Sequence, residues 1–266
     1  MTLTLAHGPL SQSLPNTVNY RVEGPAHRLL FEDFPRRVRA VFGGQTVLDT
    51  RQGKLLHETG LLPQLYVPEE DVRTDLLVPT DHHTRCPFKG TASYWSVVAD
   101  DRTAENAVWS YPEPIDEATW LRGYKAFYFD AMDAWFDEDE EVTGHLRDPY
   151  HRVDVRDSSR HVRVVVDGAV VAESDRPKLL SETGLPNRYY IPPDDVRRDL
   201  LEPSATHTVC PYKGTASYHT LRVDDRRVQD AAWFYPNPFE DALKVRGYLC
   251  FSGENILIEV DGEPAE

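Results

Sequence analysis

The residues with the clearest potential for chemistry are two cysteines that stand in the same short motif. Cys86 begins the segment Cys-Pro-Phe-Lys-Gly, and Cys210 begins the segment Cys-Pro-Tyr-Lys-Gly. A lysine three positions after a cysteine, here Lys89 or Lys213, can stabilise the thiolate, which is the reactive form of the side chain. The motif therefore predicts a nucleophilic or redox thiol in each segment. The alternative is a buried structural cysteine beside a turn, because free cysteine is among the most buried residue types.

The sequence predicts no metal site and identifies no cofactor. His83 and His207 each precede a motif cysteine by three positions, which gives two potential zinc ligands per segment. A closed structural zinc site needs four ligands. His57 offers one more in the first half of the chain, but Ser181 stands at the matching position in the second half. The glycine-rich loops that bind nucleotide phosphates are also absent.

A second group of candidates combines aromatic, basic and acidic side chains, as small-molecule pockets often do. A pocket with lysine and arginine would hold an anionic ligand. A structural interpretation remains open, in which the rings fill a β-sheet core and the basic groups pair with nearby carboxylates. The candidate ligand-binding residues are Glu58, Tyr66, Trp109, Tyr111 and Arg122, and in the second half Glu182, Tyr190, Trp233, Tyr235 and Arg246.

These candidates occur twice because the chain contains an internal repeat. Cys210 follows Cys86 by 124 positions, and the same offset matches the two halves without a gap from about residue 25 to about residue 139. A repeat this long predicts that each copy is a domain. We expect domains at 25–139 and 149–263, joined by a short polar linker at 140–148. The expected arrangement is an intrachain pseudo-dimer with pseudo-two-fold symmetry.

The elements that must position the candidates are mainly strands. In the second copy, residues 162–166 and 169–174 flank an Asp-Gly pair, which is a strong hairpin signal. Residues 217–223 and 228–235 flank an Asp-Asp turn and predict a second hairpin. Short strands are also expected near Tyr190, near Cys250 and at residues 256–260.

Two short helices are expected in each copy. In the second copy they fall at residues 192–201, where prolines and acids come first, and at residues 237–246, with Asn237 as the expected N-cap. No long helix separates the strands, which argues against a doubly wound parallel sheet. We therefore expect a mainly β (α+β) protein with two homologous small antiparallel domains, each a sandwich, an open barrel or a tent of two sheets.

Composition limits the partners. The chain has 44 acidic and 29 basic residues and a net charge of −15, which disfavours nucleic acid and anionic membranes as partners. It has no apolar run long enough to span a membrane, and its three cysteines are too few for a disulfide framework. We expect a cytoplasmic protein. Because the basic positions repeat more faithfully than the acidic ones, the composition is compatible with a small anionic ligand.

The combination of Leu-x-Glu, Tyr-Ile/Val-Pro-x-x-Asp-Val, Cys-Pro-aromatic-Lys-Gly-x-Ala-Ser-Tyr and Trp-x-Tyr-Pro-x-Pro resembles the bacterial domain-of-unknown-function family 427. The resemblance covers nearly all of the chain after residue 25, and it matches the tandem form common in actinobacteria. It implies an all-β or α+β core. The family's nucleotidyltransferase-like label implies nucleotide chemistry, for which the chain shows no constellation of residues. The family motifs include Glu58, Cys86, Lys89, Trp109 and Tyr111.

Three functions fit these observations. The leading hypothesis is a protein that binds one small anionic or heteroaromatic ligand per domain, between the cysteine–lysine turn and the Trp-x-Tyr-Pro strand. The alternatives are a cysteine-dependent enzyme and a non-catalytic scaffold. The copies differ where Trp95 matches His219 and where Ala126 matches Cys250, so we expect any divergence in activity to arise at these positions.

Overall fold

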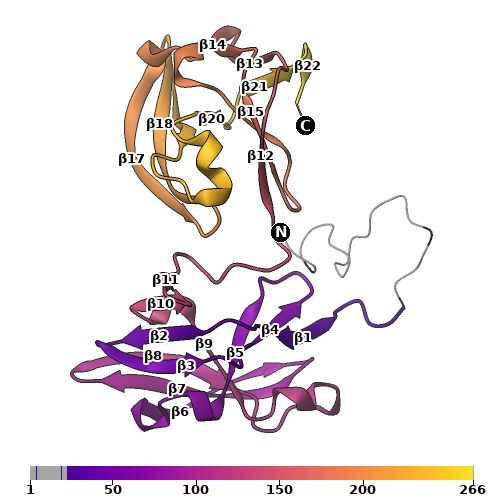
Figure 1. The fold of residues 1–266 in the computed structure, drawn as a ribbon, viewed down its shortest axis with the longest axis vertical. Helices are drawn as coiled ribbons and strands as arrows, with labels where there is room; N and C mark the ends of the chain where they lie inside the picture. The colour runs from indigo at the N-terminus through magenta and orange to yellow at the C-terminus, as the bar shows by residue number, and fades with distance from the viewer. Residues whose placement is uncertain (1–3, 5–18, 20–22, 266) are drawn as a thin grey trace. The chain divides into compact units, whose positions relative to one another are not determined.

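The computed structural model describes Thr4, Asn19 and residues 23–265. The chain divides into two compact units, the first ending at Asp148 and the second beginning at Pro149. Both units are built mainly from antiparallel strands (Figure 1). The mainly β fold expected from the repeated hairpin signals is confirmed.

The first unit contains a seven-stranded sheet and a four-stranded sheet. The large sheet has the order β1-β4-β5-β9-β8-β7-β6, and the small sheet has the order β11-β10-β2-β3. The strands are β1 (Leu29–Asp33), β2 (Val38–Phe42), β3 (Gln45–Thr50), β4 (Lys54–Glu58), β5 (Gln64–Pro68), β6 (Leu77–Cys86), β7 (Gly90–Ala99), β8 (Arg102–Ser110), β9 (Tyr124–Phe127), β10 (Ala134–Asp137) and β11 (Glu140–Glu141).

The second unit repeats this arrangement. Its large sheet appears as β12-β15-β16 and β17-β18-β19-β20, which are joined where Ile191 and Leu249 exchange backbone hydrogen bonds of 2.7 and 2.9 Å. The small sheet has the order β14-β13-β21-β22. The strands are β12 (Val153–Asp157), β13 (Val162–Val166), β14 (Ala169–Ser174), β15 (Lys178–Glu182), β16 (Arg188–Tyr190), β17 (Leu201–Cys210), β18 (Gly214–Val223), β19 (Arg226–Phe234), β20 (Cys250–Phe251), β21 (Ile256–Val260) and β22 (Glu263–Pro264).

The helical segments are 3-10 turns. They are η1 (Glu69–Asp71), η2 (Thr74–Leu76), η3 (Asp116–Leu121), η4 (Phe129–Ala131), η5 (Pro193–Asp195), η6 (Arg198–Leu200) and η7 (Glu240–Val245).

Two details of the expected helices are wrong. Residues 192–201 do not form one helix, because Val196 is extended and bridges Ala172 of β14, which separates η5 from η6. The other helix is η7, whose N-cap is Phe239 instead of Asn237. In both places tertiary packing overrides the local helix signal.

Each large sheet has a packed cluster on both of its faces. One face packs against the small sheet, with Val38, Val47 and Phe127 in the first unit and Val164, Val171 and Phe251 in the second. The opposite face carries a second cluster that η3 or η7 covers in part. We call this opposite face the aromatic face, because tyrosines and tryptophans dominate it. The candidate site residues of strands β4 to β9 lie there.

Residues at the end of the first unit pack against its core. Glu140–Glu141 forms β11 beside β10, and the backbone N–H of Val142 donates to the carbonyl of Trp135 over 2.8 Å. Val142 and Leu146 pack onto the first core, and Asp148 is buried. These residues therefore contribute to the packing of the first unit.

Candidate functional site

Strand register brings the predicted residues of the first copy onto one face. Tyr66 of β5 and Trp109 of β8 both lie opposite Ala126 of β9, and Tyr94 of β7 lies opposite Trp109. Directly opposed residues in an antiparallel pair project to the same side of the sheet. Trp109 donates its indole N–H to the Tyr66 hydroxyl over 3.3 Å, and Trp233 donates to Tyr190 over 3.2 Å in the second copy.

A histidine, a glutamate and a lysine form a hydrogen-bonded cluster at one end of this face. In the first copy, Glu58 pairs with Lys89 through one carboxylate oxygen, and its other oxygen lies 2.8 Å from Nε2 of His27. The side chains of Lys89 and Glu58 are only 10% and 9% exposed. The His27 ring also stacks on Phe88 of the cysteine–lysine motif, with ring centroids 3.9 Å apart. We call this group the His–Glu–Lys cluster.

The second copy builds the same cluster from matching positions. Glu182 pairs with Lys213, and its other oxygen lies 3.0 Å from Nε2 of His151. The His151 ring packs against Tyr212, with centroids 3.9 Å apart. Burial alone would raise the pKa of Glu182, but the hydrogen bonds from His151 and Lys213 outweigh burial and lower this pKa to about 2. Glu182 is therefore ionised near neutral pH.

Backbone pairing fixes the histidine of each cluster. β1 pairs with β4 from Leu29 opposite Glu58, so His27, two residues before Leu29, projects toward the same side as Glu58. The backbone N–H of Arg28 donates to the Thr59 hydroxyl over 2.9 Å, which extends this pairing past the end of the strand. Arg152 and Thr183 make the matching hydrogen bond in the second copy.

A glycine allows the lysine to reach the cluster. Lys89 lies in the turn between β6 and β7, where its N–H donates to the Cys86 carbonyl over 3.4 Å. Gly90 follows with a φ of +110°, which is costly for residues with a side chain. A Cβ atom at Gly90 would also lie 3.2 Å from the Glu113 carbonyl oxygen. Gly214 has the same role, with a φ of +98° and the Asn237 carbonyl oxygen 3.1 Å away.

The three cysteines have different environments. Cys86 and Cys210 are half-buried at the edge of the aromatic face, and Cys250 is buried within it. Burial raises the pKa of the Cys250 thiol to about 12, so this thiol stays protonated. Burial also raises the pKa of the Tyr111 and Tyr235 hydroxyls, with smaller contributions from the motif cysteine and the cluster glutamate of the same copy.

Two predicted basic residues lie outside the cluster. Arg122 and Arg246 are exposed and directly follow η3 and η7. In the described part of the chain, neither side chain forms an ion pair with Glu58 or Glu182, whose basic partners are Lys89 and Lys213 with the two histidines.

Sequence reasoning missed the two histidines as site residues. His27 and His151 belong to a His-Arg pair that recurs at the 124-residue offset, and this recurrence is the signal that could have identified them. Arg188 was also missed. Its guanidinium carbon lies 5.8 Å from the centroid of Trp233, and the first copy has Gln64 at the matching position.

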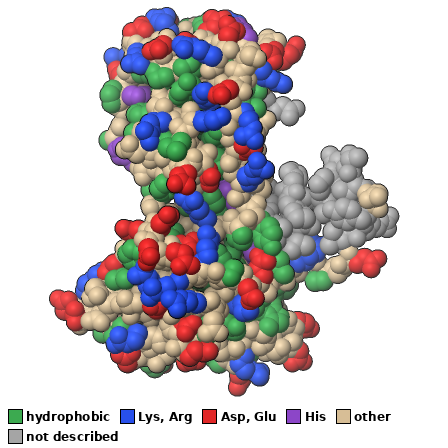
Figure 2. Space-filling model, in the orientation of Figure 1, with side chains coloured by type: hydrophobic (Ala, Val, Ile, Leu, Met, Phe, Trp, Pro, Cys, Tyr) green, Lys and Arg blue, Asp and Glu red, His purple; other side chains and the backbone are tan. Residues whose placement is uncertain are grey.

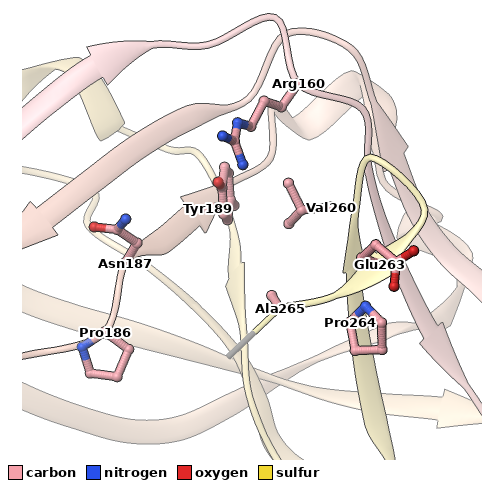
Figure 3. A pocket seen from close by; sticks show the side chains of 8 residues that line it. All are labelled: Arg160, Pro186, Asn187, Tyr189, Val260, Glu263, Pro264 and Ala265. Carbon is pink, nitrogen blue, oxygen red and sulfur yellow. The ribbon is translucent and has the colours of Figure 1, made fainter.

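Two surface cavities lie apart from the clusters. A cavity of about 450 Å³ in the second unit is lined by Arg160, Tyr189 and Glu263, among others (Figure 3). A cavity of about 300 Å³ in the first unit is lined by residues of β3 and by residues 70–73. Neither cavity is lined by a residue of a His–Glu–Lys cluster.

The visible surface of each unit intermingles acidic and basic side chains (Figure 2). Among the described residues, no group of three or more His, Cys, Asp or Glu side chains could hold a metal ion. No helix in the described part of the chain is long and apolar enough to cross a membrane.

Comparison with known proteins identifies the two copies. No curated protein matches the chain. The sequence model of a domain of unknown function, DUF427, matches residues 30–138 and again residues 154–263. These two regions contain both His–Glu–Lys clusters except for the histidines, which lie just before each matched region. The chain therefore belongs to the DUF427 family and carries two of its domains in tandem.

Proposed function

We propose that each domain binds a small anionic or heteroaromatic molecule on its aromatic face, beside the His–Glu–Lys cluster. The observation that supports this proposal is the presence of the same cluster in both copies, each at one end of an aromatic face that also carries a half-buried cysteine and a half-buried tryptophan. The ligand's ring would lie against Trp109 or Trp233. Its polar groups would reach the edge of the aromatic face at Cys86 or Cys210.

The cost of burying the cluster supports a role beyond folding. Moving a charged side chain from water into a protein interior costs several kcal/mol. The attraction between the two charges of a buried pair often only balances that cost. A well-packed apolar group at the same place would stabilise the domain as well or better. The retention of a nearly buried lysine and glutamate in both copies is therefore better explained by a need for polar groups beside a ligand.

The test is a thermal-shift screen of the full chain with nucleotides, aromatic carboxylates and neutral heteroaromatic compounds. A ligand at 100 times its dissociation constant adds about 2.7 kcal/mol of stability, which raises the melting temperature by about 5–10 °C. Replacing both site tryptophans, by Trp109→Leu and Trp233→Leu, should abolish the shift. The matched control is Arg227→Gln, an exposed residue of β19. Retention of the shift in the double variant would place the ligand elsewhere.

A cysteine-dependent enzyme is the second candidate, favoured by the half-buried positions of Cys86 and Cys210 beside the clusters. In this case Cys86 and Cys210 should react with an electrophile much faster than a free cysteine does, because the thiolate is the reactive form of the side chain. The rate of alkylation by iodoacetamide at neutral pH, compared with that of free cysteine, distinguishes the two candidates. Rates no faster than that of free cysteine at both thiols would exclude the enzyme.

We also propose a cytoplasmic location. In support, the three cysteines are free thiols in the structure, and reducing compartments maintain thiols in this form.

A further inference from the structure

The two aromatic faces differ in charge beside their tryptophans. In the second domain, the guanidinium carbon of Arg188 lies 5.8 Å from the ring centroid of Trp233. In the first domain, the matching Gln64 donates its side-chain amide to the backbone carbonyls of Leu65 and Phe127, over 3.1 and 3.3 Å. The side chain that matches Arg188 in the first domain is therefore neutral and already bonded to the backbone.

Arg188 is available to bind a ligand. It is half-buried on β16, and its position opposite Leu180 places it on the aromatic face. Among the described residues, no carboxylate lies within ion-pair distance of its guanidinium, although most arginines of this acidic protein have such a partner. The nearby Lys213 is paired with Glu182. Arg188 therefore brings to the side of Trp233 a positive charge that no described carboxylate balances.

The tryptophans also differ in what covers them. In the first domain, Tyr128 packs on Trp109 with ring centroids 4.7 Å apart, and 49% of Tyr128 is exposed. In the second domain, the exposed Ser252 stands at the matching position. The side chain beside Trp233 is therefore a charged arginine, whereas the side chain packed on Trp109 is an uncharged tyrosine.

We infer that the second domain is specific for an aromatic anion, whose ring lies against Trp233 and whose planar carboxylate pairs with the guanidinium of Arg188. The first domain takes a neutral aromatic group. A guanidinium suits this ligand because it forms two parallel hydrogen bonds with a carboxylate and also packs on aromatic rings. This inference rests on the proposed function and assigns a ligand class to each of its two sites.

The test compares benzoate with benzamide, which has nearly the same shape and no charge. The five indole N–H signals of the full-length protein are followed by NMR after labelling with ¹⁵N-tryptophan, and Trp233→Phe and Trp109→Phe assign the two relevant signals. Benzoate should shift the Trp233 signal at a concentration at least ten times lower than benzamide does. At the Trp109 signal, benzoate should have no such advantage.

Arg188→Gln installs the residue that the first domain has and should remove the preference for benzoate, with at least a tenfold loss of affinity. Gln64→Arg should create a preference for benzoate at Trp109. Arg227→Gln is the control, because it removes an exposed arginine of the same domain. Circular dichroism of each variant checks that it remains folded.

Three outcomes would overturn the inference: equal affinity for the two probes at Trp233, unchanged benzoate affinity in Arg188→Gln, or no response of Trp233 to either probe. The first two leave the proposed function intact, because a ligand still binds at Trp233. The proposed function itself fails only if the thermal-shift screen also finds no ligand that depends on Trp109 or Trp233.

Discussion

Glu58 and Glu182 hold each cluster together, because each accepts hydrogen bonds from a histidine and a lysine that lie far away in the sequence. The sequence motifs predict both glutamates and both lysines as site residues. The structure shows that each lysine pairs with the glutamate of its own copy. The interpretation in which basic side chains pair with nearby carboxylates therefore holds for Lys89 and Lys213.

Removal of one partner should destabilise the second domain strongly. Glu182→Gln leaves Lys213 buried without its counter-charge, and the loss of one partner of a buried pair typically costs about 3–5 kcal/mol. Urea unfolding should show this loss. The double variant Glu182→Gln with Lys213→Met should lose less than Glu182→Gln alone, since no charge is left unpaired.

The control is Arg197→Gln, which breaks an exposed pair with Asp199 and should cost less than about 1 kcal/mol. Equal losses in Glu182→Gln and Arg197→Gln would show that the buried cluster contributes no more than a surface pair.

The low pKa of Glu182 predicts a pH dependence of stability. The folded domain holds this pKa at about 2, below its ordinary value of 4.5. Folding favours the ionised form of Glu182. Its contribution to the free energy of unfolding is therefore complete above pH 4.5 and disappears as the pH falls toward 2. Urea unfolding between pH 6 and pH 2 should show a steeper loss of stability for the natural sequence than for Glu182→Gln. Parallel curves would contradict the assignment.

Among the elements, the hairpins were the most predictable, because strand alternation and turn residues are local signals. The Asp-Gly turn between β13 and β14 has φ angles of +50° at Asp167 and +85° at Gly168, as a type I′ turn requires. The helical segments were less predictable. Pairing of Val196 with β14 divides one of them, and only the folded chain brings these residues together.

The glycine of the cysteine–lysine turn should be more sensitive to substitution than a hairpin glycine. Gly214 and Gly168 both have positive φ, but only Gly214 would bring a Cβ atom close to another backbone group, at 3.1 Å. Gly168→Ala should cost about 1 kcal/mol from backbone strain alone. Gly214→Ala should cost measurably more in thermal unfolding. Equal losses of stability in the two variants would show that the backbone at Asn237 moves away from the new Cβ atom at no cost in free energy.

At the scale of the whole molecule, the repeat predicts two domains, and we propose that each folds independently. Residues 142–148 then belong to the first domain instead of acting as a free linker, because Val142 and Leu146 pack onto its core. A fragment of residues 1–148 should therefore be more stable than a fragment of residues 1–139, by about 2 kcal/mol from the apolar surface that these two side chains bury.

Urea unfolding of the two fragments measures this difference. Residues 149–266 provide a comparison, since they contain the second domain together with β22, the counterpart of β11. Equal stability of the two first-domain fragments would show that residues 140–148 contribute nothing to folding.

The duplication, the mainly β character and the cysteine–lysine motif can be read from the sequence, because they depend on residue order and on local patterns along the chain. The meeting of His27 and Lys89, each 31 positions from Glu58, at one carboxylate is visible only in the folded chain. The same holds for the position of Arg188 beside Trp233. Strand register sets these contacts, and register depends on the packing of both sheet faces at once, which no local pattern encodes.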